Sequence, residues 1–173
     1  MVSKIGNKTI NYNIYVRQNN KLNKILDTSE VTLPSIENLT DTIKGSGILG
    51  EIDFPAYYQP GAMSLEISTR VSNADLGILI SAIDIEIRWV TDEFDSSNAK
   101  VGINSHKAFF KVINKKFEEG KLAMGEAQEG SLEYEVLAYK RVINGKEVLN
   151  IDKLNGIFAI NGKNLAQDIQ AAL

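Results

Sequence analysis

Residues 45–50 spell the pattern G-x-G-x-x-G, whose glycines can let a dinucleotide pyrophosphate approach the N-terminus of a helix. That fingerprint requires a buried strand before the glycines and a helix after them. Residues 35–44 are largely polar, however, and Pro55 and Pro60 prevent a long helix downstream. The glycines therefore predict a flexible loop that exposes its backbone, and no cofactor is expected.

The other side chains with catalytic potential do not form a recognisable set. The chain has no cysteine and a single histidine, His106, which excludes thiolate chemistry and histidine-pair metal sites. His106 is expected on the surface or on an edge strand. No serine lies in a G-x-S-x-G elbow. Five clustered carboxylates do not match calcium-loop spacing and are interpreted as a solvated face: Asp84, Glu86, Asp92, Glu93 and Asp95. We expect no catalytic residue and no metal site.

A basic stripe alternates with aromatic residues between positions 107 and 117, as in some nucleic-acid platforms. Its members are Lys107, Lys111, Lys115 and Lys116, near Phe109, Phe110 and Phe117. Alternation places Phe110 and Val112 on one face and Phe109 and Ile113 on the other, which predicts a strand packed on both sides. The net charge of −3 also opposes a grip on phosphates.

Length and composition are those of one globular domain spanning residues 1–173. Hydrophobic residues make up 43% of the 173 residues and charged residues 24%, both near the globular average. No apolar run approaches the roughly 20 residues of a membrane helix, and residues 1–8 lack the apolar core of a secretion signal. We expect assembly in a cytoplasm, without insertion into a membrane.

Hydrophobic alternation predicts a mainly β chain with one helix. Alternating segments predict strands near 10–16, 63–70, 85–90, 107–117 and 130–143, and a returning strand near 25–33. Asn144-Gly145 predicts a tight hairpin onto 147–152. Apolar residues at helical spacing predict a helix over 72–83, and 165–173 is a short tail helix or a loose end. Residues 91–98 and 118–130 are expected to be polar or flexible connections.

The stretch from Val31 to Pro55 is long, rich in glycine and apolar in places. In a small domain such a segment usually exists to contact another molecule. Residues 40–60, which overlap the second half of this stretch, are therefore expected to form a long extended loop that contacts another molecule.

Several segments together resemble the major tail tube protein of contractile-tailed bacteriophages and of headless phage-tail bacteriocins (tailocins). They are residues 10–16, 30–36, 44–55, 63–67, 144–152 and 161–165, which span nearly the whole chain. Val31-Thr-Leu-Pro34 followed about a dozen residues later by the glycine-rich segment is the most specific feature. The turn at 18–21 departs from the pattern, because it lacks the glycine expected in relatives.

The resemblance implies a structural protein without catalysis. It implies a β-sandwich or barrel with one flanking α-helix, whose strands join those of five other subunits in a continuous inner β-barrel. Hexameric rings of this kind stack helically into a hollow tube that is a conduit for DNA or for membrane piercing. The implied partners are the contractile sheath protein, a baseplate or tube initiator and a tail terminator, with tape measure protein and DNA passing through the lumen. The implied location is the virion tail or a tailocin particle, assembled in the bacterial host cytoplasm.

Two sets of residues are candidates for the contacts of such a tube. The apolar anchors of ring-to-ring contact are Ile43, Ile48, Leu49, Ile52 and Phe54. The candidates that face the lumen are Ser64, Glu66, Ser68, Glu133 and Glu135, which would repel DNA phosphates. The glutamates can equally face the sheath or solvent.

Two other functions remain open at this stage. One is a tube protein of the type VI secretion kind, built on the same fold. The other is a monomeric β-barrel that binds a small ligand. The formation of tubes or rings separates both tube proteins from the monomeric barrel.

Overall fold

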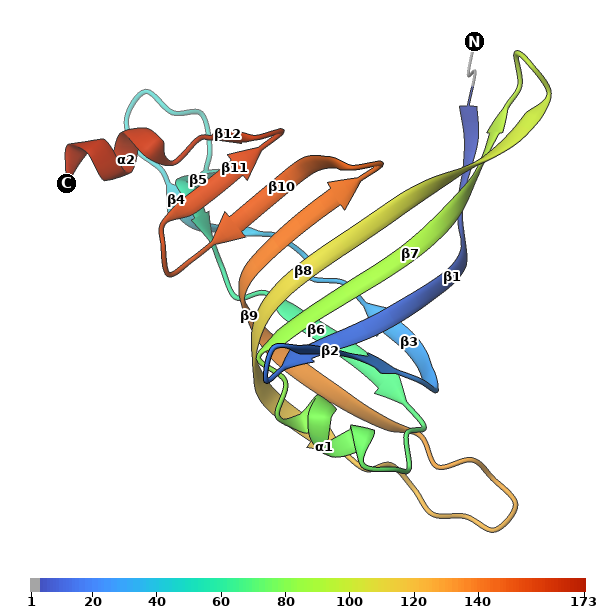
Figure 1. Cartoon of the computed structure of the whole chain (residues 1–173). Helices are drawn as coiled ribbons and strands as arrows, with labels where there is room; N and C mark the ends of the chain where they lie inside the picture. Colours follow the sequence, from blue (N-terminus) through green and yellow to red (C-terminus); the bar gives the residue numbers. More distant parts are fainter. Residues whose placement is uncertain (1–3) are drawn as a thin grey trace.

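A computed structural model describes residues 4–173, which form mostly strands (Figure 1). The first strands are β1 (Lys4–Gln18), β2 (Lys21–Ile25), β3 (Thr28–Thr32), β4 (Asn38–Ile43), β5 (Ile52–Pro60) and β6 (Ser64–Thr69). The helix α1 (Asp75–Ile80) separates these from β7 (Asp84–Asp95), β8 (Lys100–Glu118) and β9 (Gly130–Ile143). The chain ends with β10 (Lys146–Asp152), β11 (Ile157–Ile160), β12 (Lys163–Asn164) and α2 (Gln167–Ala172). The predicted mainly β fold class is confirmed.

Ten strands form one antiparallel sheet that curls around the core (Figure 1). Its order is β12-β11-β10-β9-β8-β7-β1-β2, and β6 and β3 continue the sheet from the lower part of β9. The long strand β9 makes this branch possible, because residues 130–135 pair with β6 while residues 138–143 pair with β10. The strands β4 and β5 pair only with each other.

The core lies inside the curl of the sheet, where alternate side chains of β1, β6, β7, β8 and β9 meet. Its largest fully buried members are Tyr134, Ile14, Met63, Leu65, Ile67, Leu79, Ile85, Ile87, Leu132, Ile151, Val16 and Val112. The helix α1 packs against this core through Leu79, and the hydroxyl of Tyr134 donates a hydrogen bond of 2.8 Å to the Leu79 carbonyl. The predicted helix is present over fewer residues than expected.

Asparagines lie in the tight turns of several hairpins. Asn144 and Gly145 have φ of 47° and 79°, which confirms the hairpin predicted from these two residues. The turn between β1 and β2 has φ of 50° at Asn19 and 59° at Asn20. Asparagine tolerates the left-handed region, so this turn forms without the glycine that relatives were expected to carry.

The prediction of one returning strand over residues 25–33 is wrong. The strand β2 ends at Ile25, and β3 pairs with β6 instead of β1. Asp27 has φ of 59° and redirects the chain between them. Its carboxylate also accepts a hydrogen bond of 2.9 Å from Arg70, which fixes the new direction.

The prediction of a polar loop over residues 91–98 is also wrong for its first half. The strand β7 continues to Asp95 and pairs with both β1 and β8. The polar side chains that suggested a loop find partners across these strands, as in the ion pair of 2.7 Å between Lys4 and Glu93. Paired polar residues therefore extend a strand here beyond the apolar core.

Candidate assembly surfaces

The segment 38–60 is a two-stranded hairpin with a connecting turn, called the arm below, rather than the long loop expected over 40–60. Register places Ile43 opposite Ile52, and Asp41 opposite Phe54. Because paired residues share a face and neighbours alternate, Ile43, Ile52 and Phe54 lie on one face. The opposite face carries Thr42, whose hydroxyl donates a hydrogen bond of 2.7 Å to Asp53. One face of the arm thus carries these three apolar residues together with Asp41, and the other face is polar.

The apolar face of the arm is uncovered in the single chain. Ile43 is 43% exposed, Ile52 50%, Phe54 60% and Leu49 104%. Ile48 is partly buried in the turn, where its amide donates to the Gly45 carbonyl. Of the five residues predicted for ring-to-ring contact, the structure therefore leaves four exposed and brings three onto one face.

The glycine pattern at 45–50 lies in the turn between two strands of the arm. Gly47 and Gly50 have φ of 91° and 90°, a conformation that side chains disfavour. A strand follows these glycines instead of a helix. The geometry that places a pyrophosphate on a helix N-terminus is therefore not formed at this segment.

The base of the arm is fixed to the C-terminal part of the chain. The ring of Tyr58 lies 5.3 Å from that of Phe158 in β11 and 4.1 Å from that of Tyr57. The amide of Gly61 donates a hydrogen bond of 2.7 Å to the Glu37 carbonyl, which closes the hairpin at its root. The arm therefore projects from the β11 end of the sheet (Figure 1).

The five residues predicted to face a lumen lie together on one face of the β6–β9 pair. Register pairs Ser64 with Glu135, and Glu66 with Glu133. Ser68 follows on the same face of β6, two residues beyond Glu66. The opposite face of this pair contributes buried residues to the core. The predicted set is therefore a continuous polar face that points away from the core.

Lysines neutralise most of the negative charge on this polar face. Lys115 forms an ion pair of 2.7 Å with Glu133, whose carboxylate also accepts a hydrogen bond of 3.0 Å from Ser64. The hydrogen bond from Lys115 holds the pKa of Glu133 below its ordinary value. Lys153 pairs with Glu135 at 3.2 Å, while Glu66 forms no ion pair within residues 4–173. The sequence did not reveal these lysines, because Lys115 meets Glu133 only through the pairing of β8 with β9. Lys153 reaches Glu135 from the segment that follows β10.

The prediction that His106 lies on the surface or an edge strand is wrong. His106 is buried on the interior strand β8, and its ring stacks on Trp89 at 5.2 Å. Arg141 donates a hydrogen bond of 3.0 Å to Nδ1 of His106, so the neutral ring carries its proton on Nε2. This N–H donates a hydrogen bond of 2.8 Å to the hydroxyl oxygen of Thr91. Burial, and secondly the charge of Arg141, lower the pKa of His106. This cluster is structural, since every ring nitrogen is engaged.

The basic stripe of β8 is packed on one face only, so the expectation of packing on both faces is wrong. Phe110 and Val112 are buried in the core. On the opposite face Ile113 is 57% exposed, and Lys111 and Lys115 are exposed as well. That face has no covering layer in the single chain, because the sheet curls away from it.

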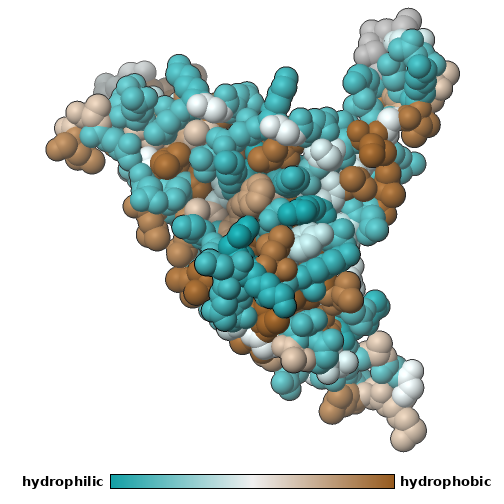
Figure 2. Space-filling model, viewed as in Figure 1, coloured by the Kyte–Doolittle hydropathy of each residue, from teal (hydrophilic) through white to brown (hydrophobic). Residues whose placement is uncertain are grey.

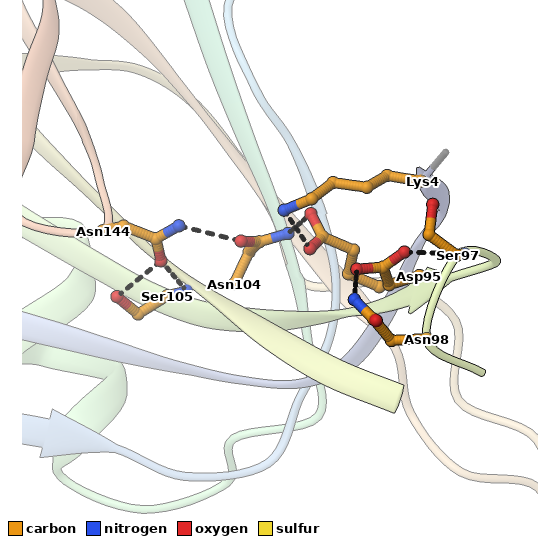
Figure 3. A network of polar contacts seen from close by, with 8 residues as sticks. Lys4, Asp95, Ser97, Asn98, Asn104, Ser105 and Asn144 are labelled. Carbon is orange, nitrogen blue, oxygen red and sulfur yellow. Dashed lines mark hydrogen bonds and ion pairs between the residues drawn. The ribbon is translucent and has the colours of Figure 1, made fainter. Parts of the chain in front are cut away.

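The outer ends of β1, β7 and β8 project beyond the core as a three-stranded extension. A chain of polar contacts ties it to the β9–β10 turn (Figure 3): Glu93 accepts from Lys4 and from Asn104, and Asn144 donates to Asn104 at 2.8 Å. Its other face carries an apolar row in register, with Ile5 58% exposed, Phe94 42% and Val101 76%. Figure 2 shows apolar surface on this projecting end.

Helices long and apolar enough to cross a membrane are lacking in residues 4–173. The same residues contain no cluster of three or more histidine, cysteine, aspartate or glutamate side chains placed to hold a metal ion.

Comparison with known proteins identifies the family. The family model described as phage tail tube protein FII matches residues 7–173. The chain belongs to this family. Its role is that of a structural protein of a tail tube, as the resemblance had implied. No curated protein matches the sequence significantly.

Solved structures of contractile injection systems contain similar chains. A chain in the sheath/tube terminator of the extracellular contractile injection system PVC, in the extended state, is 11% identical with a TM-score of 0.51. The match covers 78% of this tail tube protein and 94% of that chain, and it supports a shared fold. A chain in the six-fold symmetrised baseplate of the anti-feeding prophage is 13% identical with a TM-score of 0.48, covering 76% and 91%. One in the PVC sheath-tube complex is 9% identical with a TM-score of 0.47, covering 77% and 87%.

Proposed function

We propose that this tail tube protein is the major tube subunit, which forms hexameric rings that stack helically into a hollow tube. The observation that carries the proposal is the arm, which leaves Ile43, Ile52 and Phe54 uncovered on one face of a hairpin whose strands pair only with each other within residues 4–173. Monomeric proteins seldom expose such a row, and uncovered patches mark interaction sites. In a tube, every copy supplies a partner for the patch on its neighbour.

Open strand edges supply the contacts within a ring. Within the described residues, residues 4–13 of β1 have a strand neighbour on one side, which is β7. On the other side, the pairing of β1 with β2 starts only at Ile14. An open edge invites pairing with another chain, and a closed ring satisfies every such edge with a copy of the same molecule. Strands of six subunits then form one continuous inner barrel. The apolar row of Ile5, Phe94 and Val101 becomes buried between neighbours.

The arm supplies the contacts between rings. Its anchors are Ile43, Ile48, Leu49, Ile52 and Phe54, and burying one such side chain completely is worth roughly 1.5–3 kcal/mol. The arm and the surface that receives it are different patches, so the contact is head-to-tail and repeats along the axis. A baseplate or tube initiator starts the tube, and a tail terminator ends it.

The polar face of β6 and β9 lines the lumen in this proposal, with Ser64, Glu66, Ser68, Glu133 and Glu135 repeated six times in each ring. On that face Glu133 and Glu135 form ion pairs with lysines, and Glu66 interacts electrostatically with Lys116 without a direct ion pair. A bore whose carboxylates are balanced by lysines in this way offers phosphates no net attraction. Tape measure protein and DNA pass through it without specific binding.

The tube is enclosed by a contractile sheath protein, in the tail of a virion or in a tailocin particle assembled in the bacterial host cytoplasm. Contraction of the sheath then drives the tube forward for DNA delivery or membrane piercing. The neighbouring PVC and anti-feeding prophage chains come from sheath, tube and baseplate assemblies, which supports these partners. The subunit itself does not insert into a membrane.

Electron microscopy of the concentrated protein, with and without a pre-built baseplate, tests this function. The proposal predicts tubes built from six-membered rings. A strictly monomeric protein under both conditions would refute it. In particles that carry DNA, Glu66→Lys should slow DNA ejection relative to the wild-type protein. Unchanged ejection in Glu66→Lys would place Glu66 outside the lumen.

A further inference from the structure

The curled sheet is open along one seam, between β1 and β3. Within residues 4–173, the outer edge of β1 has no neighbouring strand along residues 4–13. The strand β3 pairs with β6 on one edge, and its other edge is open. A hydrogen bond of 2.8 Å from the Tyr12 hydroxyl to the Thr28 carbonyl closes the lower end of the seam. Above that bond, two strand edges with unpaired backbone groups face a common opening.

A groove of about 250 Å³ occupies this opening. Its floor is apolar and consists of Tyr12, Val31, Leu33, Ile87 and Trp89. These side chains belong to the core or pack against it, so the groove is an exposed continuation of the core. Its volume lies below the roughly 300–1,000 Å³ of small-molecule sites. An apolar floor between two open strand edges suits an extended segment that adds to the sheet.

We propose that this groove, called the seam groove, receives the arm of a second copy of the chain. This inference rests on the tube function proposed above and names the surface that the arm contacts. The arm offers what the groove lacks, which is a hairpin with open edges and alternate apolar side chains at Ile43, Ile52 and Phe54. One or two of these side chains cover the floor while a strand of the arm pairs with the free edge of β3. The edge of β1 is then left to the neighbouring subunit within the ring.

The arm of the same molecule is held away from its own groove. Its base is fixed by Tyr58 on Phe158 at the β11 end of the sheet, whereas the seam groove lies at the β1 end (Figure 1). Within residues 4–173, the strands β4 and β5 pair only with each other. The occupant of the groove is therefore an arm from another molecule.

Charge complementarity supports this pairing. The arm carries Asp41, Glu51 and Asp53 against one lysine, Lys44, which gives it a net charge of −2 over residues 38–60. On the β1 side Lys4 is already paired with Glu93, and Glu30 lies on the rim of the groove, so Lys8 is the cation that β1 offers to the arm. Lys8 forms no ion pair within residues 4–173 and stays available to a carboxylate of the arm.

The contact is heterologous, because the arm and the seam groove are different surfaces of one molecule. Such a contact leaves an unfilled groove at one end of the assembly and a free arm at the other. Growth then adds identical subunits in one direction, as a tube requires. The groove also explains why Trp89 and Tyr12 remain only partly buried in the single chain.

The absence of cysteine from the chain allows a direct test by cross-linking. Single-cysteine variants Ile52→Cys and Ser29→Cys, mixed in equal amounts and assembled with wild-type chain into tubes, are oxidised and separated on a denaturing gel. Ser29 is an exposed residue on the rim of the groove. The matched control replaces Ser29→Cys by Lys24→Cys, on the exposed part of β2 away from the groove.

The proposal predicts a disulfide-linked dimer with Ser29→Cys and none with Lys24→Cys. Tubes without the Ser29 cross-link, or with equal cross-links in both mixtures, would overturn the groove assignment while the tube function stood. If wild-type chain forms no tubes at all, the proposed function fails together with this inference.

A charge exchange gives a second readout that does not depend on cysteine geometry. Lys8→Glu should raise the critical concentration for tube formation about tenfold, because like charges then face each other. Asp41→Lys in the same chain should restore most of the loss, because Asp41 lies on the face of the arm that enters the groove, whereas Lys24→Glu should change little. Assembly that is insensitive to Lys8→Glu, or a loss that Asp41→Lys does not reverse, would contradict the contact.

Discussion

Substitutions on the apolar face of the arm should weaken assembly without changing the stability of the folded subunit. Replacing Ile52 and Phe54 together by serine removes two side chains that are 50% and 60% exposed in the single chain. Full burial of each is worth roughly 1.5–3 kcal/mol, so the exposed half of each contributes about 1 kcal/mol when a neighbour covers it. The pair therefore contributes about 2 kcal/mol per subunit contact. Because about 1.4 kcal/mol corresponds to a factor of ten, the critical concentration should rise about 30-fold.

The assay is sedimentation of tubes over a concentration series, with the free energy of unfolding measured by urea denaturation. The free energy of unfolding should change by no more than about 0.5 kcal/mol, as for other surface substitutions. The matched control changes Thr40 and Thr42, on the polar strand face of the same hairpin, to serine, and should assemble like wild type. An unchanged critical concentration in the double serine variant, or an equal loss in the control, would refute the role of the apolar face.

Other substitutions test the fold that supports these surfaces. Tyr134→Phe should reduce the free energy of unfolding by about 1 kcal/mol, since the Leu79 carbonyl keeps a second donor at the helix end; no loss in urea denaturation would contradict that bond. The lowered pKa of His106 means that the unfolded chain binds a proton more readily than the folded one, so stability should fall as pH drops below 6.5. His106→Gln should flatten that part of the pH profile, and an unchanged profile would oppose this. Gly145→Ala, at φ of 79° with no atom near the added Cβ, should lower the free energy of unfolding by about 1–2 kcal/mol. Gly120→Ala should lower it clearly more, because the added Cβ meets a backbone carbonyl. Equal decreases in the melting temperature of the two variants would contradict this clash.

The sequence was sufficient for the fold class, while the contact role of the arm residues stays a prediction. Strict alternation in β6 and β9 reports burial directly, because each strand has one face on the core. The hairpin at Asn144-Gly145 follows from local turn chemistry that tertiary contacts do not override. The five lumen candidates were grouped correctly on one outward face, because β6 and β9 alternate in register.

Long-range partners decided the features that the sequence did not reveal. The polar residues of β7 beyond Val90 looked like a loop, since the partners of Glu93 lie on β1 and β8. His106 looked exposed for the same reason, because Trp89 and Arg141 cover it from neighbouring strands. The arm looked like an irregular loop because its strands carry polar residues on one face and glycines in the turn.

Cryo-electron microscopy of the assembled protein tests the central claim most directly. We expect stacked six-membered rings in which each arm lies against a subunit of the adjacent ring, with Ile52 and Phe54 covered. Tubes whose arms remain in solvent, or a protein that stays monomeric beside a pre-built baseplate, would contradict it.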